Sequence, residues 1–186
     1  QTSPQSPFGS WDFRLVIVSA TWNNTGGALP NNGDFGLIVL QDQSFSGGAP
    51  VTVRTKVGAS FTAVTNNLAN THVTMLGYPC NFNSCTIMQR NDSSDHRVGS
   101  TAASNNAFEY GSDMAGGSSG GPWVQNFGDP LSATPTGLRN LTRNAVVGVT
   151  SYGFIDPNVK ILGASGFNAE FASILNAACA NATGNC

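Results

Sequence analysis

The sequence predicts an all-β protein that ends in a single α-helix. Short apolar or alternating runs are separated by clusters of Gly, Asn, Pro and Ser, a pattern typical of strands joined by turns. The expected strands cover residues 14–19, 35–40, 51–57, 72–76, 121–124 and 146–151. Near the end, Phe171, Ile174, Leu175 and Ala178 have the spacing i, i+3, i+4, i+7, which predicts a helix over residues 168–178 that docks on a core.

The composition excludes some classes of partner. The chain has 186 residues, 40% of them hydrophobic but without a long apolar run, so we expect no membrane segment. Only 10% of the residues are charged, and a formal net charge of -2 provides no basic field for nucleic acids or anionic membranes. The abundance of neutral polar residues suits a secreted, extracellular protein, and a start at Gln1 is expected after removal of a leader.

The four cysteines form two close pairs in the sequence, Cys80 with Cys85 and Cys179 with Cys186. Four cysteines allow three pairings, of which we favour the two local bridges. Neither spacing is the CxxC pattern of a zinc site, and the chain has only two histidines. We therefore expect structural disulfides, formed in an oxidising compartment, and no metal site.

A Gly- and Ser-rich hexapeptide, Gly117-Ser118-Ser119-Gly120-Gly121-Pro122, has the composition of a nucleophile turn. A nucleophilic hydroxyl needs an exposed tight turn whose N–H groups converge on a developing oxyanion, and glycine allows that close approach. The hexapeptide resembles the Gly-Asp-Ser-Gly-Gly-Pro signature of trypsin-like serine peptidases. The resemblance implies that Ser119 is the nucleophile and that the N–H groups of Gly117 and Ser119 form the oxyanion hole. The alternative is a flexible Ser/Gly loop.

Other segments resemble the same family in the expected order. Gly77-Tyr78-Pro79 is similar to a strand end early in the second barrel, and residues 148–153 are similar to the strand that lines the substrate cleft. The likeness runs from about Gly9 to Ala178 and includes the general look of the glutamyl-endopeptidase-like branch of secreted bacterial and fungal enzymes. It implies the chymotrypsin fold of two six-stranded β-barrels. Residues 1–58 are then a partial first barrel, and residues 59–186 are the second barrel with the terminal helix.

Asp34 lies just before an apolar run, residues 35–40, that predicts a buried strand. In the family, an Asp in this position orients the catalytic histidine and stabilises its imidazolium form. The resemblance therefore implies that Asp34 is the second catalytic residue. The alternative is an ordinary turn residue beside Gly33.

The catalytic histidine is absent from the place that the family order of His, Asp and Ser implies. No His precedes Asp34, whereas His72 and His96 follow it and are expected on the surface of the second barrel. Residues 1–57 also offer only about three strands, too few to close a barrel. We therefore expect a light chain or cleaved N-terminal segment, held noncovalently, to supply the missing strands and the histidine.

The resemblance implies acyl transfer from a polypeptide substrate, without a cofactor. Thr150, Ser151, Tyr152 and Gly153 are expected to line the substrate cleft, where Thr150 replaces the His typical of glutamyl-specific enzymes. Asp113 occupies the position of the acid at the base of the trypsin pocket, which favours Lys or Arg in the substrate. Alternatively, Asp113 holds loop backbone.

Two other classes compete with the peptidase. A noncatalytic protease homologue, acting as a binding or regulatory protein, would explain the lack of a catalytic His, although the Ser119 turn and Asp34 would then be surplus. A carbohydrate-binding or adhesive β-protein is a third alternative, but the aromatic residues are not periodically spaced. Reaction of Ser119 with a fluorophosphonate separates the peptidase from both.

Overall fold

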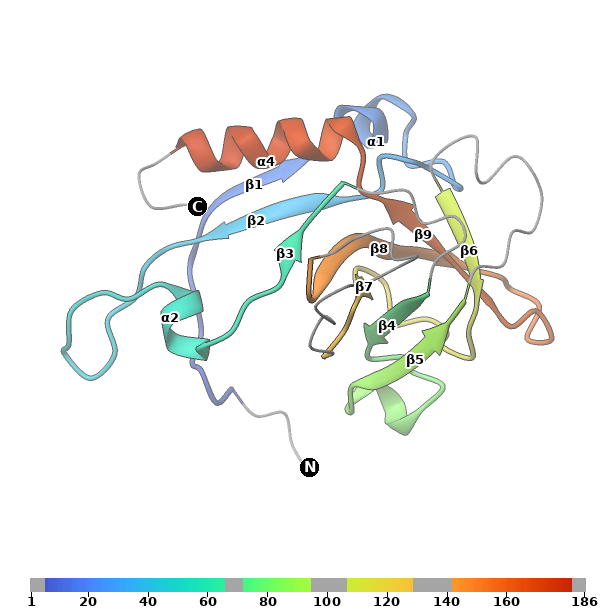
Figure 1. The fold of residues 1–186 in the computed structure, drawn as a ribbon, viewed down its shortest axis with the longest axis horizontal. Coiled ribbons are helices and arrows are strands. Elements are labelled where there is room, and N and C mark those ends of the chain that lie inside the picture. Colours follow the sequence, from blue (N-terminus) through green and yellow to red (C-terminus); the bar gives the residue numbers. More distant parts are fainter. Residues whose placement is uncertain (1–5, 66–71, 95–106, 129–141, 182–186) are drawn as a thin grey trace.

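The computed structural model describes residues 6–65, 72–94, 107–128 and 142–181, which form two β-sheets and a C-terminal helix (Figure 1). In chain order the elements are β1 (Phe13–Val18), α1 (Ala20–Asn24), β2 (Gly36–Leu40), α2 (Val53–Val57), β3 (Thr62–Ala63), β4 (Val73–Gly77), η1 (Asn83–Cys85), β5 (Gln89–Ser93), β6 (Ala107–Gly111), β7 (Pro122–Gln125), β8 (Ala145–Gly153), β9 (Ile161–Gly166) and α4 (Ala169–Asn181). No helix in these ranges is long and apolar enough to cross a membrane.

The larger sheet has seven strands and curls into a half-barrel. Its strand order is β5-β4-β7-β8-β9-β6, with β3 pairing in parallel with β8, and all other neighbours are antiparallel. Its core contains ten buried residues: Val73, Met75, Phe108, Tyr110, Met114, Trp123, Ala145, Val147, Leu162 and Ala164. This core fixes β6 and β7, the strands before and after the Ser119 turn.

The smaller sheet consists of β1 and β2, which are antiparallel, with Val16 opposite Ile38. Helix α4 packs on it and joins it to the larger sheet (Figure 1). The shared core contains Phe35, Phe167 and Phe171, and the rings of the latter two stack with centroids 3.5 Å apart. Asn168 caps the start of α4, because its Oδ1 accepts a 3.0 Å hydrogen bond from the N–H of Phe171.

The mostly β fold with a terminal helix is confirmed, and five of the six expected strands lie within a residue or two of the observed strands. The strand expected over residues 51–57 is wrong. The segment forms α2, because Thr52 caps the helix by accepting the Thr55 N–H, and Gly58 ends it in the left-handed region with φ 76°. Only Val51 keeps a β-bridge, to Gln43.

The expected disulfide between Cys80 and Cys85 is confirmed. Cys179 is also disulfide-bonded, but Cys186, its expected partner, lies outside the described residues. The same is true of His96.

Candidate active site

Ser119 lies on the exposed turn that leads from β6 into β7. Two hydrogen bonds of 2.9 Å fasten the turn to β8: the Gly120 N–H donates to the Thr150 carbonyl, and the Thr150 N–H donates to the Gly121 carbonyl. Ser118, beside the candidate nucleophile, is buried, and its hydroxyl donates to the Ala115 carbonyl at 2.5 Å. The turn is therefore held from both sides, while Ser119 itself faces solvent.

Glycine is required at two positions of this turn. Gly117 has φ +99°, and a Cβ there would lie 2.6 Å from the Tyr78 carbonyl oxygen and 2.7 Å from Cys80 Sγ. A Cβ on Gly121 would overlap the Leu76 carbonyl oxygen. The glycines thus let the turn lie directly on the end of β4, which explains their place in the motif.

The expected oxyanion donors are free in the described part of the chain. The N–H groups of Gly117 and Ser119 donate no hydrogen bond there, whereas the intervening Ser118 N–H is bonded to the Ala115 carbonyl at 3.2 Å. Gly117 and Ser119 are both exposed. Two unpaired N–H groups beside the Ser119 hydroxyl can bind a negatively charged oxygen.

Asp34 contacts the same strand that holds the Ser119 turn. Its Oδ2 accepts a 2.5 Å hydrogen bond from the Ser151 hydroxyl on β8, across a sequence separation of 117 residues. Ser151 directly follows Thr150, the residue bonded to the Ser119 turn. Adjacent residues of β8 therefore contact the two expected catalytic segments.

A cavity of about 350 Å³ opens beside Ser119. It is enclosed by the loop before Ser119, the end of β8, the β8–β9 loop and the start of β9; its lining includes Asp113, Met114, Thr150, Tyr152, Gly153, Phe154, Lys160 and Leu162. Four of the five expected substrate-binding residues line it, and the fifth, Ser151, contacts Asp34 instead.

Asp113 forms an ion pair at this cavity. Its carboxylate lies 3.7 Å from Lys160 Nζ, and both side chains are more than half exposed. Its backbone carbonyl accepts a 2.8 Å hydrogen bond from Asn81 Nδ2. The sheet register maintains the ion pair, because the Ser112 N–H donates to the Lys160 carbonyl at 2.9 Å, next to the pairing of Gly111 with Ile161.

Two polar contacts, one buried and one partly buried, hold the cleft strand. The Thr150 hydroxyl accepts a 3.0 Å hydrogen bond from the indole N–H of Trp123. The Tyr152 hydroxyl donates to the Glu109 carboxylate at 2.7 Å. Burial and this bond to an anion raise the pKa of Tyr152 well above its usual range, so Tyr152 stays neutral and donates.

Of the two expected surface histidines, only His72 lies in the described part of the chain. His72 is exposed just before β4, near Asp92 of β5, which is an edge strand of the large sheet. His96 is outside the described ranges. Within those ranges, no group of three or more His, Cys, Asp or Glu side chains could hold a metal ion.

The arrangement of a half-barrel sheet, a second sheet and a terminal helix has counterparts among solved structures. A thermostable serine protease, AL20, from an extremophilic microorganism matches 96% of this chain and 71% of its own, with TM-score 0.69 and 22% identity. This is the fold of chymotrypsin-like serine proteases. The protease Anisep from Arthrobacter nicotinovorans shares that fold with 20% identity, 95% and 70% coverage and TM-score 0.66.

A Glu endopeptidase also matches the protease fold, with 22% identity, TM-score 0.63, and coverage of 94% of this chain and 66% of its own. No family model matches the chain, and no curated protein sequence does. The structural likeness therefore establishes the fold, whereas the chemistry rests on the residues of this chain.

Three residues at the site were not predicted from the sequence: Lys160, which pairs with Asp113; Asn81, which holds the loop before Ser119; and Glu109, which binds Tyr152. Asn81 had one local signal, its place inside the short loop closed by Cys80 and Cys85. Lys160 and Glu109 had none, because only the strand pairing brings them to the site.

Proposed function

We propose that this chain is the nucleophile-bearing part of a secreted serine endopeptidase. Ser119 attacks the carbonyl carbon of a peptide bond, the N–H groups of Gly117 and Ser119 bind the resulting oxyanion, and Asp34 orients a histidine supplied by polypeptide outside these residues. The disulfides suit an oxidising, extracellular compartment.

The observation that carries this proposal is the pair of contacts on β8. Thr150 holds the Ser119 turn, and Ser151 holds the Asp34 carboxylate. Because consecutive Cα atoms are about 3.8 Å apart, both groups face one short segment of the strand. That placement supports a cleft in which one imidazole ring contacts both the Ser119 hydroxyl and the Asp34 carboxylate.

The reaction needs the histidine as a proton carrier. It takes the proton of the Ser119 hydroxyl as the Oγ–C bond forms, and gives that proton to the nitrogen of the leaving amine as the C–N bond breaks. In the second half, the histidine takes a proton from water, the resulting hydroxide attacks the acyl-enzyme, and the proton returns to Ser119. The products are an amine and a carboxylic acid, with no cofactor.

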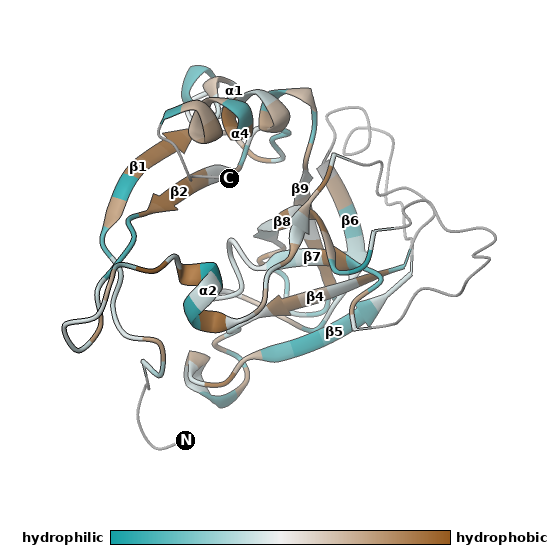
Figure 2. Ribbon diagram, turned by 60° about the vertical axis from the view of Figure 1, so that its left-hand side comes forward, coloured by the Kyte–Doolittle hydropathy of each residue, from teal (hydrophilic) through white to brown (hydrophobic). Residues whose placement is uncertain are grey.

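An exposed apolar face on the small sheet is a second argument for an additional segment. Val16, Val18 and Ile38 lie on one face of β1 and β2 and are 52%, 54% and 66% exposed. Both strands carry hydrophobic residues along most of their length (Figure 2), and a groove of about 620 Å³ lies beside them, between β2, α2 and α4. Additional strands would bury this apolar surface, and we propose that they carry the histidine.

We also propose that the cavity beside Ser119 prefers an uncharged side chain. A preference for Lys or Arg requires a free carboxylate, but Asp113 has Lys160 within 3.7 Å. Asp156, at the same cavity, accepts hydrogen bonds from the backbone and side chain of Asn158 and so holds its own turn. The remaining wall is largely apolar, formed by Met114, Leu162 and their neighbours.

A fluorophosphonate probe tests the function. The protein purified from its natural source, with any accompanying segment, should become labelled on Ser119, and the Ser119→Ala variant of the same preparation should remain unlabelled. Mass spectrometry and N-terminal sequencing should find a second peptide that contains a histidine. If the source protein stays unlabelled while folded, the noncatalytic homologue replaces the peptidase as the interpretation.

A further inference from the structure

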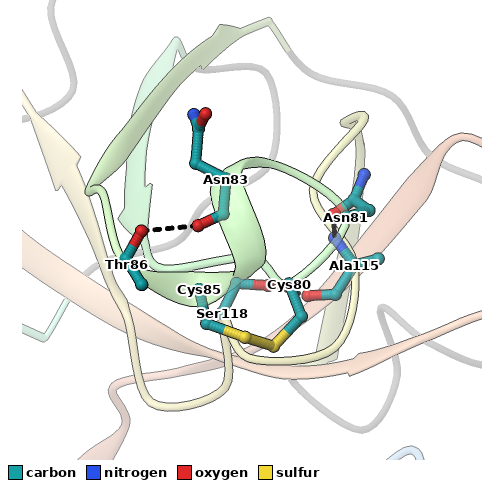
Figure 3. Close-up of a disulfide and its surroundings, with 7 residues drawn as sticks. All are labelled: Cys80, Asn81, Asn83, Cys85, Thr86, Ala115 and Ser118. Atoms are coloured by element: carbon teal, nitrogen blue, oxygen red, sulfur yellow. Dashed lines mark hydrogen bonds between the residues drawn. A yellow bond between two sulfur atoms is a disulfide. The ribbon is translucent and has the colours of Figure 1, made fainter. Parts of the chain in front are cut away.

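The disulfide loop, residues 80–85, packs against the turn that precedes Ser119. Figure 3 shows Cys80 and Asn81 beside Ala115 and Ser118, on the side of the loop where the sulfur bridge lies. The Cys80 N–H donates to the Gly116 carbonyl at 2.7 Å. The Asn81 side chain bonds twice: Nδ2 donates to the Asp113 carbonyl at 2.8 Å, and Oδ1 accepts the Ala115 N–H at 3.1 Å.

The bond from Cys80 determines which way one peptide unit points. The Gly116 carbonyl and the Gly117 N–H belong to the same trans peptide, and in a trans peptide these two groups point in opposite directions. A carbonyl held toward Cys80 therefore directs the Gly117 N–H away from the loop. This N–H is one of the two proposed oxyanion donors, and within the described ranges it has no other hydrogen-bond partner.

The opposite orientation is accessible unless something prevents it. Gly117 has no Cβ, so its φ of +99° involves little steric cost, and a peptide between two glycines can rotate more freely than any other. Rotation by half a turn would point the carbonyl oxygen, rather than the N–H, at the developing negative charge. The hydrogen bonds from residues 80 and 81 oppose that rotation.

The crosslink keeps the loop in the shape that makes these bonds. Asn83, Ser84 and Cys85 are consecutive residues with φ of 49°, 51° and 62°. This left-handed conformation is unfavourable for residues with a Cβ and persists only where the surroundings enforce it. The Cys80–Cys85 bridge spans these three residues, so its removal frees the loop and, with it, the Cys80 N–H.

We propose that the Cys80–Cys85 loop is an orienting strap for the oxyanion hole, in which Cys80 and Asn81 are positioning residues. The strap fixes the Gly116–Gly117 peptide with its N–H toward the substrate carbonyl, so that the donor is oriented before the reaction begins. This inference rests on the proposed peptidase activity, and it assigns a catalytic role to a disulfide that the triad chemistry does not use.

Steady-state kinetics of the complete, histidine-containing protein test the strap. Asn81→Ala, and separately the double variant Cys80→Ser with Cys85→Ser, should lower kcat by about 10- to 100-fold, less than the 10²- to 10³-fold typical of losing an oxyanion donor outright. KM should change by less than about twofold, because the bond to the oxyanion exists only in the transition state. Thr86→Val is the matched control, since it removes a 2.6 Å bond from the residue after the loop to the Asn83 carbonyl, without touching residues 113–117.

A second readout does not depend on activity. Amide hydrogen exchange should be slow at Cys80 in the native protein and at least about tenfold faster in Asn81→Ala, and the Gly117 amide resonance should shift in that variant but not in Thr86→Val. The proposed orienting role would be overturned by an unchanged kcat in both loop variants. It would also be overturned if the Cys80 amide exchanged at the same rate in Asn81→Ala as in the native protein. If the native protein fails to react with a fluorophosphonate, the peptidase proposal fails by itself, and the exchange data still decide whether the loop orients the peptide.

Discussion

The Ser151 hydroxyl and the Asp34 carboxylate are joined by a 2.5 Å hydrogen bond that links the large sheet to the small one. Ser151→Ala removes the donor and leaves Asp34 free to rotate. We expect about a tenfold lower kcat, since a hydrogen bond to a charged group is worth on the order of 1.5 kcal/mol. Ser173→Ala, which loses a hydroxyl bonded on the exposed face of α4, should keep the native rate. A native kcat in Ser151→Ala would show that Asp34 needs no such support.

Gly117→Ala tests the nucleophile turn. The added Cβ would lie 2.6 Å from the Tyr78 carbonyl oxygen, so the turn must shift and the Gly117 N–H must move with it. We expect kcat to fall by at least about 100-fold, the effect of losing one oxyanion donor. Gly47→Ala is the control, because Gly47 also has positive φ, +77°, but has open space around it and lies away from the cleft. Equal activity in both variants would contradict the assigned donor.

The sequence could predict those elements that local pattern determines. The Ser119 turn depends on glycines at fixed positions, and Asp34 on a carboxylate next to an apolar strand, so both are visible in a few consecutive residues. Four strands were missed: β3, β5, β6 and β9. Two of these, β5 and β9, lack a strand-like sequence, because β5 is Gln-Arg-Asn-Asp-Ser and β9 is rich in Gly, Ala and Ser. Their pairing with neighbouring strands, rather than β propensity, makes them strands.

At residues 51–57 the sequence predicted a strand where the structure has a helix. Val51, Val53 and Val57 favour a strand by propensity, yet the Thr52 cap and the left-handed Gly58 determine a short helix. Lys160 was missed for another reason, and so was Asn81 apart from its place in the disulfide loop. Their partners are distant in sequence, 32 residues for Asn81 and Asp113, and only the folded sheet brings each pair together.

Lys160→Gln should alter the substrate preference proposed for the cavity. Without the ammonium group, the Asp113 carboxylate is free to bind a cationic side chain. We expect kcat/KM for a substrate with Arg before the scissile bond to rise about tenfold relative to one with Leu, a change of roughly 1.4 kcal/mol. Stability should change by less than about 0.5 kcal/mol, because the pair is exposed. Lys56→Gln, in α2, is the charge-matched control, and an unchanged preference would place the determinant elsewhere.

Tyr152→Phe should destabilise the large sheet. The Glu109 side chain, only 9% exposed, would lose the hydroxyl that binds it, and an unsatisfied buried carboxylate costs about 1–3 kcal/mol. Urea unfolding at pH 7 measures the loss, with Tyr78→Phe as the control on a half-exposed ring. Because the pKa of Tyr152 is raised in the folded state, its contribution is present below about pH 10 and declines as pH rises further. Native stability in Tyr152→Phe would rule out this contact as a support of the cleft.

The hydrogen bond that Glu170 accepts should contribute less to the stability of the protein in acid. The Glu170 carboxylate accepts the Thr21 N–H at 3.0 Å and thereby ties α4 to the start of α1, and the hydrogen bonds from Thr21 lower its pKa below the usual value. A lowered folded pKa means that the contribution is present above about pH 4.5 and is lost as pH falls through the folded pKa. Asp92 behaves in the same direction: burial alone would raise its pKa, but hydrogen bonds from Arg90 and Thr74 together lower it. Glu170→Gln should therefore have a lower free energy of unfolding than the native chain at pH 7, and the two free energies should converge by about pH 3. Asp92 is present in both proteins, so its titration lowers the stability of both and does not affect the difference. Parallel urea midpoints at pH 7 and pH 3 would instead show that the Thr21 contact does not depend on the charge of Glu170.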